Sequence, residues 1–94
     1  MSLAVDYKKT SSKDEAFSSV REVITPEYIS KFKVKADVDY DESDKIITAT
    51  GKGFTLVFSF DESQVGLDLK LSLMLKPLRG QIEGMMVKEL KKVV

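Results

Sequence analysis

Residues 65–73 read VGLDLKLSL, a run in which apolar side chains alternate with small, charged or hydroxyl-bearing ones. Successive side chains of an extended chain point to opposite faces, so this spacing predicts a β-strand with one face in the core and the other in water. The residues expected to point inward are Val65, Leu67, Leu69, Leu71 and Leu73.

Weaker forms of the same alternation precede this run. They occupy residues 3–7, 34–40, 45–50 and 54–60. Short segments rich in Asp, Glu, Ser and Gly separate the later ones, at 41–44, 51–53 and 61–64. Residues of these types favour tight turns, so the chain from residue 34 onward is expected to form an antiparallel meander.

A first helix is predicted between the first two strands. Ser12 and Glu15 have the spacing of a capping box, in which both side chains accept hydrogen bonds from backbone N–H groups at a helix start. The apolar face that follows runs from Ala16 to Ile24 at helical spacing.

Two prolines mark further helix starts. Pro26 cannot continue the first helix, so Thr25 is expected to cap a second short helix that reaches about Lys31. Pro77 ends the strand pattern, and residues 78–93 are predicted to form the closing helix. The residues expected to return the chain to the core after the second helix start are Tyr28, Ile29 and Phe32.

These elements predict one domain over residues 1–94. The expected class is a two-layer α+β fold, an antiparallel sheet of about five strands with helices on one face, in the order β-α-β-β-β-β-α. A chain of this length commits most of its apolar side chains to the fold. We therefore expect Phe54, Phe58 and Phe60 to fill the interior and leave no large ligand cavity.

Composition argues against several functions. Fifteen basic and fifteen acidic residues give a net charge of zero, which disfavours nucleic acid as a partner. The chain has neither cysteine nor histidine, so thiolate chemistry, the commonest general base and the commonest metal ligand are missing. We predict no enzyme activity and no catalytic, cofactor-binding or metal site. The acidic residues between 37 and 44 are expected to form a solvated hairpin tip, and Gly51–Gly53 a tight strand connection.

No transmembrane span and no secretory signal is expected, because apolar runs of sufficient length are absent and the start of the sequence lacks the pattern of a leader. The predicted location is the cytoplasm.

The closing helix is more apolar and more basic than a core helix requires. Gly80 and Gly84 share a face, which predicts close packing against the sheet, the first helix or a second subunit. The candidate interaction surface on this helix comprises Val87, Lys88, Lys91, Lys92 and Val94. The sequence does not distinguish three partners for this surface: another protein, a second copy in a homodimer, and a lipid-like or polymer surface.

The sequence from residue 65 to 83 resembles the polyhydroxyalkanoic acid system proteins of bacteria. In that family an alternating leucine strand leads into a Leu-Leu-x-Pro-Leu-basic-Gly-x-Ile-Glu turn and a closing helix with a Glu-Leu-like pair, here Glu89-Leu90. Gly51 and Gly53, followed by Thr55 and Leu56, resemble the family's central strand more loosely. The resemblance implies a protein associated with polyester storage granules and assigns no catalytic residues.

Two functions are therefore expected. The first is a non-enzymatic accessory or surface-binding protein of the polyhydroxyalkanoate granule system, which acts through a protein partner, self-association or the granule surface. The alternative is a carrier of a small lipid-like ligand, similar to helix-grip proteins, in which a long helix lies across a curved antiparallel sheet.

Overall fold

The computed structural model describes residues 2–31 and 34–94. Along the chain the elements are β1 (Ser2–Asp6), α1 (Lys13–Val23), α2 (Pro26–Ser30), β2 (Ala36–Asp41), β3 (Ile46–Gly51), β4 (Phe54–Phe60), β5 (Gln64–Leu71), the 3₁₀ turn η1 (Lys76–Leu78) and α3 (Arg79–Val93). The predicted α+β class and element order are confirmed. Phe32, which we expected in the core, lies outside the described residues.

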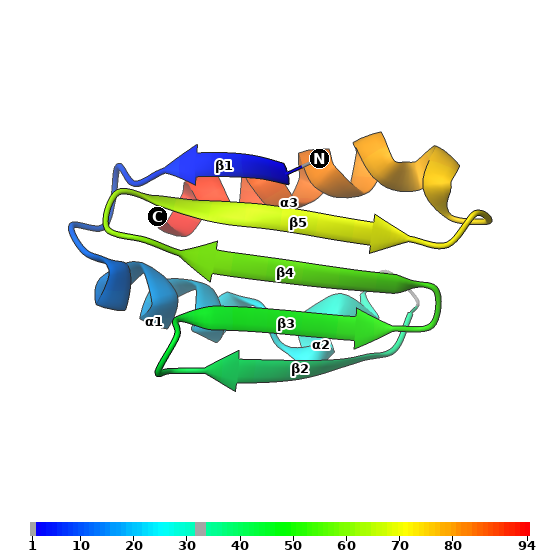
Figure 1. The fold of residues 1–94 in the computed structure, drawn as a ribbon, viewed down its shortest axis with the longest axis horizontal. Helices are drawn as coiled ribbons and strands as arrows, with labels where there is room; N and C mark the ends of the chain where they lie inside the picture. The colour runs from blue at the N-terminus through cyan, green and yellow to red at the C-terminus, as the bar shows by residue number, and fades with distance from the viewer. Residues whose placement is uncertain (1, 32–33) are drawn as a thin grey trace.

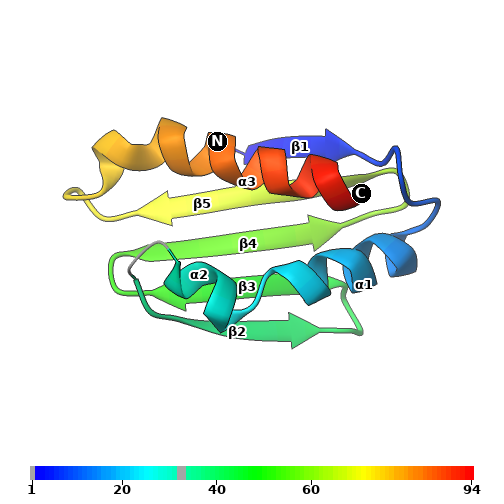
Figure 2. The same ribbon diagram turned by 180° about the vertical axis from the view of Figure 1, so that it is seen from behind.

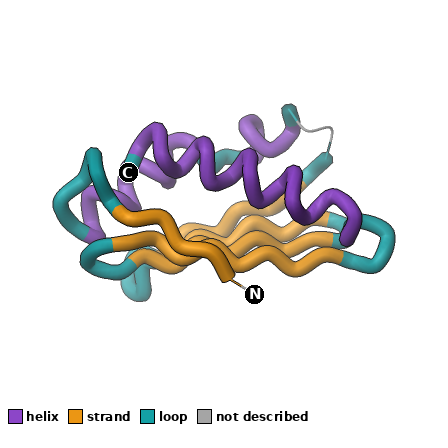
Figure 3. Tube along the Cα trace, turned by 90° about the horizontal axis from the view of Figure 1, so that it is seen from above, coloured by secondary structure: helices purple, strands orange, loops and turns teal. Residues whose placement is uncertain are grey.

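All strands belong to one antiparallel sheet with the order β1-β5-β4-β3-β2 (Figure 1). Strands β2 to β5 form a meander of successive hairpins. The first strand of the chain, β1, pairs with the last strand, β5, at the edge of the sheet. The helices form a second layer on one face of the sheet, as Figure 3 shows from above.

The core lies between the central strands and the helices. Phe58 of β4 pairs across the ladder with Leu67 of β5, and both are buried. Phe17 of α1 and Leu90 of α3 are buried in the same cluster. Burying these side chains supplies the main favourable free energy of the fold.

Helix starts follow the predicted capping chemistry. The hydroxyl of Ser12 accepts from the N–H of Glu15 at 3.2 Å, and the Glu15 carboxylate accepts from the N–H of Ser11. The hydroxyl of Thr25 accepts from the N–H of Tyr28 at 3.1 Å, which begins α2 directly after α1 ends. These bonds satisfy donors that the first turn of a helix cannot pair internally.

The leucine run ends sooner than its pattern predicts. Strand β5 ends at Leu71, which pairs with Phe54 at the start of β4, and the N–H of Ser72 bonds to the carbonyl of Gly53 in the neighbouring hairpin turn. In the part of the chain that the structure describes, β5 has no partner strand beyond that point. Leu73 is therefore 80 % exposed, so its expected place in the core is wrong. Val34 is likewise exposed, because β2 begins only at Ala36.

Comparing Leu67 with Leu73 tests this boundary. Leu67→Ala should lower the free energy of unfolding by about 2–5 kcal/mol, because it leaves a cavity in a close-packed core. Leu73→Ala should change it by less than about 0.5 kcal/mol, as expected for an exposed site. Urea unfolding of the two variants measures both values, and equal losses would contradict the observed end of β5.

Tyr7 joins the end of β1 to the β4–β5 turn. Its hydroxyl donates to the carbonyl of Asp61 at 2.7 Å. Burial, with the nearby negative charges of Asp61 and Glu62, raises the pKa of Tyr7 to about 12. The neutral phenol is thus favoured by the fold.

The raised pKa of Tyr7 predicts a loss of stability in alkali. Between about pH 10 and 12 the unfolded chain releases the Tyr7 proton while the folded chain retains it, so the free energy of unfolding falls as pH rises. In Tyr7→Phe the free energy of unfolding should fall less steeply over this pH range, because the phenol whose ionisation causes the fall is absent. Urea unfolding at several pH values compares the two slopes, and identical slopes would show that Tyr7 ionises alike in both states.

Candidate functional site

The two long helices converge at one end of the sheet and diverge toward the other (Figure 2). They contact each other on the side where the chain ends. At the opposite end, which we call the pocket end, an apolar pocket lies between α2 and the first half of α3. The pocket end comprises residues 28–31, 34–36, 50–56 and 69–79.

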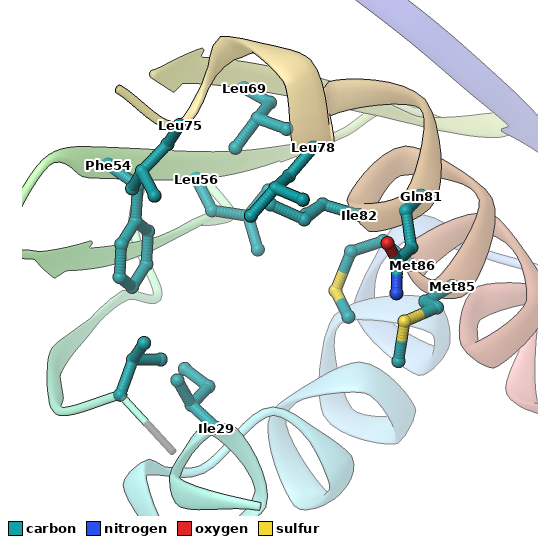
Figure 4. Close-up of a pocket in the computed structure, with 11 residues that line it drawn as sticks. Ile29, Phe54, Leu56, Leu69, Leu75, Leu78, Gln81, Ile82, Met85 and Met86 are labelled. Carbon is teal, nitrogen blue, oxygen red and sulfur yellow. The ribbon is translucent and has the colours of Figure 1, made fainter. Parts of the chain in front are cut away.

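The pocket is bounded by side chains from both layers (Figure 4). Strands β4 and β5 form the floor, α3 forms one wall, and Ile29 of α2 faces it from the other side. Gln81 is the one polar residue among those that line it. The lining residues are Ile29, Val34, Phe54, Leu56, Leu69, Leu75, Leu78, Gln81, Ile82, Met85 and Met86.

The pocket has a volume of about 270 Å³ and opens onto the surface at Leu78 and Val34. Phe58 and Phe60 are buried as expected, and Phe54 is only partly buried. Of the three phenylalanines of β4, only Phe54 reaches it. Phe60 packs instead edge-on against Phe17 of α1, with ring centroids 5.5 Å apart, where the helices converge. The aromatic residues therefore pack mainly where the helices converge, and aliphatic side chains and methionines line the pocket.

The chemistry of the pocket is that of an apolar binding site. Among the described residues, no ionisable side chain lines it. The tyrosines whose pKa is raised, mainly by burial, are Tyr7, Tyr28 and Tyr40, and none is among the lining residues. The arrangement can hold an apolar group and offers one amide, that of Gln81, to a polar end.

The surface predicted on α3 is only partly exposed. Lys88, Lys91 and Lys92 lie in water, with Lys92 paired to Glu89 at 3.1 Å, and Val87 is half-buried against the core. Val94 is 1 % exposed, so its expected place on this surface is wrong.

The burial of Val94 has a simple geometric cause. It stands four residues after Leu90 and eight after Met86, so it continues their buried face. Its carbonyl also accepts from the N–H groups of Lys8 and Lys9, at 2.6 and 2.7 Å. Helical spacing alone was enough to predict this position.

Gly80 and Gly84 do not pack against the sheet or α1. A methyl group built on either meets no atom within 4 Å. Two of the three expected contacts are therefore wrong, and contact with a second subunit stays a prediction.

The other polar motifs have structural roles. The carboxylate of Asp41 accepts from the N–H groups of Ser43 and Asp44, both at 3.1 Å, which closes the β2–β3 turn. Gly53 adopts φ 87° in the turn to β4. Within residues 2–31 and 34–94, no group of three or more acidic side chains is arranged to hold a metal ion.

Comparisons with known proteins give no match, whether against protein families, curated proteins or solved structures. In the described part of the chain, no helix has the length and apolar character needed to cross a bilayer.

Replacing Gly84 by alanine tests whether its face of α3 is free. Gly84→Ala should raise the free energy of unfolding by about 0.5–1 kcal/mol, because alanine favours the helix and meets no neighbour. Gly53→Ala is the control and should lower it, since Gly53 has a positive φ. Thermal unfolding measures both. A loss of stability in Gly84→Ala, together with a loss of self-association, would place a second copy on this face.

Proposed function

We propose that this protein is a non-enzymatic binding protein that takes an apolar chain into the pocket between α2 and α3. The observation that carries the proposal is the pocket itself, a space of about 270 Å³ lined by apolar side chains and one amide. An apolar groove that is open to water leaves favourable burial unused, and a ligand that covers it gains that free energy.

Water is a poor occupant of such a space. An ordered water needs about two to four polar partners, and among the described lining residues Gln81 is the one with a polar side chain. An apolar cavity of roughly 150 Å³ already suffices for a benzene-sized ligand. The pocket therefore suits a short hydrocarbon chain or a comparable apolar group, whose burial is favourable by about 0.8 kcal/mol for each CH₂.

The pocket is also accessible. Leu78 and Val34, which both line it, are 44 % and 39 % exposed, so its lining continues onto the surface. Met85 and Met86 give α3 an adaptable wall, because methionine side chains are flexible and polarisable. These features favour an exchangeable ligand over a permanently buried one.

A non-enzymatic role is supported by the residues around the pocket. Binding needs only shape and apolar surface, which the lining provides, whereas acid–base or nucleophilic chemistry needs a titratable or activated group within reach of the ligand. Among the described residues, none of the pocket-lining side chains is of that kind.

A second candidate is the surface-binding role in a polyester granule system. It is supported by the resemblance of residues 65–83 and by the exposure of Leu73 and Met74 on the loop that follows β5. A surface-binding protein needs exposed apolar groups of this kind.

Titration with dodecanoate, a single-chain fatty acid, tests the pocket. We expect saturable binding of one molecule per chain by calorimetry, and a corresponding mass increase in native mass spectra. Met85→Trp should weaken it at least about tenfold, or ~1.4 kcal/mol, because the larger ring fills the pocket.

Lys88→Trp is the matched control, on the same helix but away from the pocket, and should leave the affinity unchanged. Absence of dodecanoate binding to the unmodified protein would count against the proposal. Equal binding by both tryptophan variants would show that the fatty acid binds elsewhere.

A further inference from the structure

An apolar turn projects from the pocket end of the molecule. Leu73 and Met74 lie in the loop between β5 and η1 and are 80 % and 89 % exposed. This loop extends beyond the neighbouring strand ends in Figure 1. Neither residue lines the pocket, so the fold does not use them.

The turn is held in place by backbone hydrogen bonds. The carbonyl of Ser72 accepts from the N–H groups of Leu75 and Lys76, at 3.0 and 3.1 Å. The N–H of Ser72 bonds to the carbonyl of Gly53 at 2.8 Å. Leu73 and Met74 are therefore presented on a defined turn that is anchored to the sheet.

Exposed apolar residues are concentrated at this end. The large hydrophobic residues exposed in the described chain are Val34, Leu73, Met74 and Leu78. All of them lie on the pocket or on the loop beside it. Exposed apolar residues gathered at one end mark an interaction site more often than scattered ones do.

Positive charges predominate at the pocket end. Its cations are Lys31, Lys35, Lys52, Lys70, Lys76 and Arg79. Arg79 is paired with Glu83 at 3.3 Å, and Asp37 lies opposite Thr50 on the neighbouring strand, so the lysines carry the excess charge. The turns at the other end of the sheet carry Asp41, Glu42, Asp44, Asp61 and Glu62, of which Glu42 is paired with Arg21 and Glu62 with Lys13.

The acidic end does not cancel this positive field. The molecule is 38 Å long, whereas charges in physiological salt are screened over about 8 Å. A partner at the pocket end therefore meets a basic surface, although the whole chain has a net charge of zero.

We propose that the pocket end docks on an anionic lipid–water interface. Leu73 and Met74 insert among the acyl chains, and the surrounding lysines lie at the level of the negative head groups. This arrangement combines the two terms that bind peripheral proteins to membranes, burial of apolar side chains and attraction of Lys and Arg to anionic lipid. A neutral polymer surface would use the apolar turn but not the cations.

Sedimentation with vesicles tests this docking. The probes are vesicles of phosphatidylcholine with phosphatidylglycerol, vesicles of phosphatidylcholine alone, and particles of polyhydroxybutyrate. We expect binding to the anionic vesicles that weakens in raised salt, and at least about tenfold weaker binding to the neutral ones.

Two double variants address the two parts of the surface. Leu73→Ser with Met74→Ser should weaken binding to anionic vesicles at least about tenfold, as should Lys70→Gln with Lys76→Gln. The matched control is Lys88→Gln with Lys91→Gln, which removes two exposed lysines of α3 outside the pocket end and should change binding less than about twofold. All variants should keep the urea midpoint of the unmodified protein, because the altered side chains are exposed.

Docking of the pocket end on lipid goes beyond ligand binding by the pocket, and the two can be tested separately. The Leu73/Met74 variant should still bind dodecanoate, and Met85→Trp should still bind vesicles. Equal binding to neutral and anionic vesicles, sedimentation with the polyester particles alone, or loss of vesicle binding only in the Lys88/Lys91 control would each overturn the proposal.

Discussion

Coverage of one face of the sheet by the helices is the constraint on which the rest of the structure depends. Five strands spaced by about 4.8 Å form a sheet roughly 19 Å wide, and a helix with its side chains covers about 10 Å. Helices must therefore lie side by side to bury the face. The 15 residues of α3 cover the β1–β5 side, and the 11 residues of α1 with the 5 of α2 cover the β2–β3 side.

The break between α1 and α2 determines where that coverage is incomplete. Pro26 cannot continue α1, and the five-residue α2 then leads the chain back toward β2. Where α1 and α3 meet, Phe17, Phe60 and Leu90 close the interior. Where α2 stands opposite α3, Leu56 and Leu69 form the floor of an open pocket. The helix break at Pro26 thus places the pocket between the short α2 and the start of α3.

Local sequence signals predicted the elements well because each has a local cause. The caps at Ser12 and Thr25 depend on residues only three positions away. The end of β5 was missed because it depends on where β4 begins, and an alternating pattern contains no information about its partner strand. The pocket was missed for a similar reason, since it arises from the relative positions of α2 and α3. Val94 is different, because the helical spacing that buries it is present in the sequence.

Charge shows the limit of composition most clearly. A net charge of zero is an average over the whole chain, whereas a partner responds to charges within about one screening length of its own surface. Here the pocket mouth, the Leu73–Met74 turn and the cations share one end of the molecule. A ligand chain that passes between the pocket and a lipid layer touching that end avoids transfer through water, which costs about 0.8 kcal/mol for each exposed CH₂. The proximity of these features gives the carrier and the docking proposals a common physical reason, because uptake and release are easiest where the pocket opens directly onto the lipid.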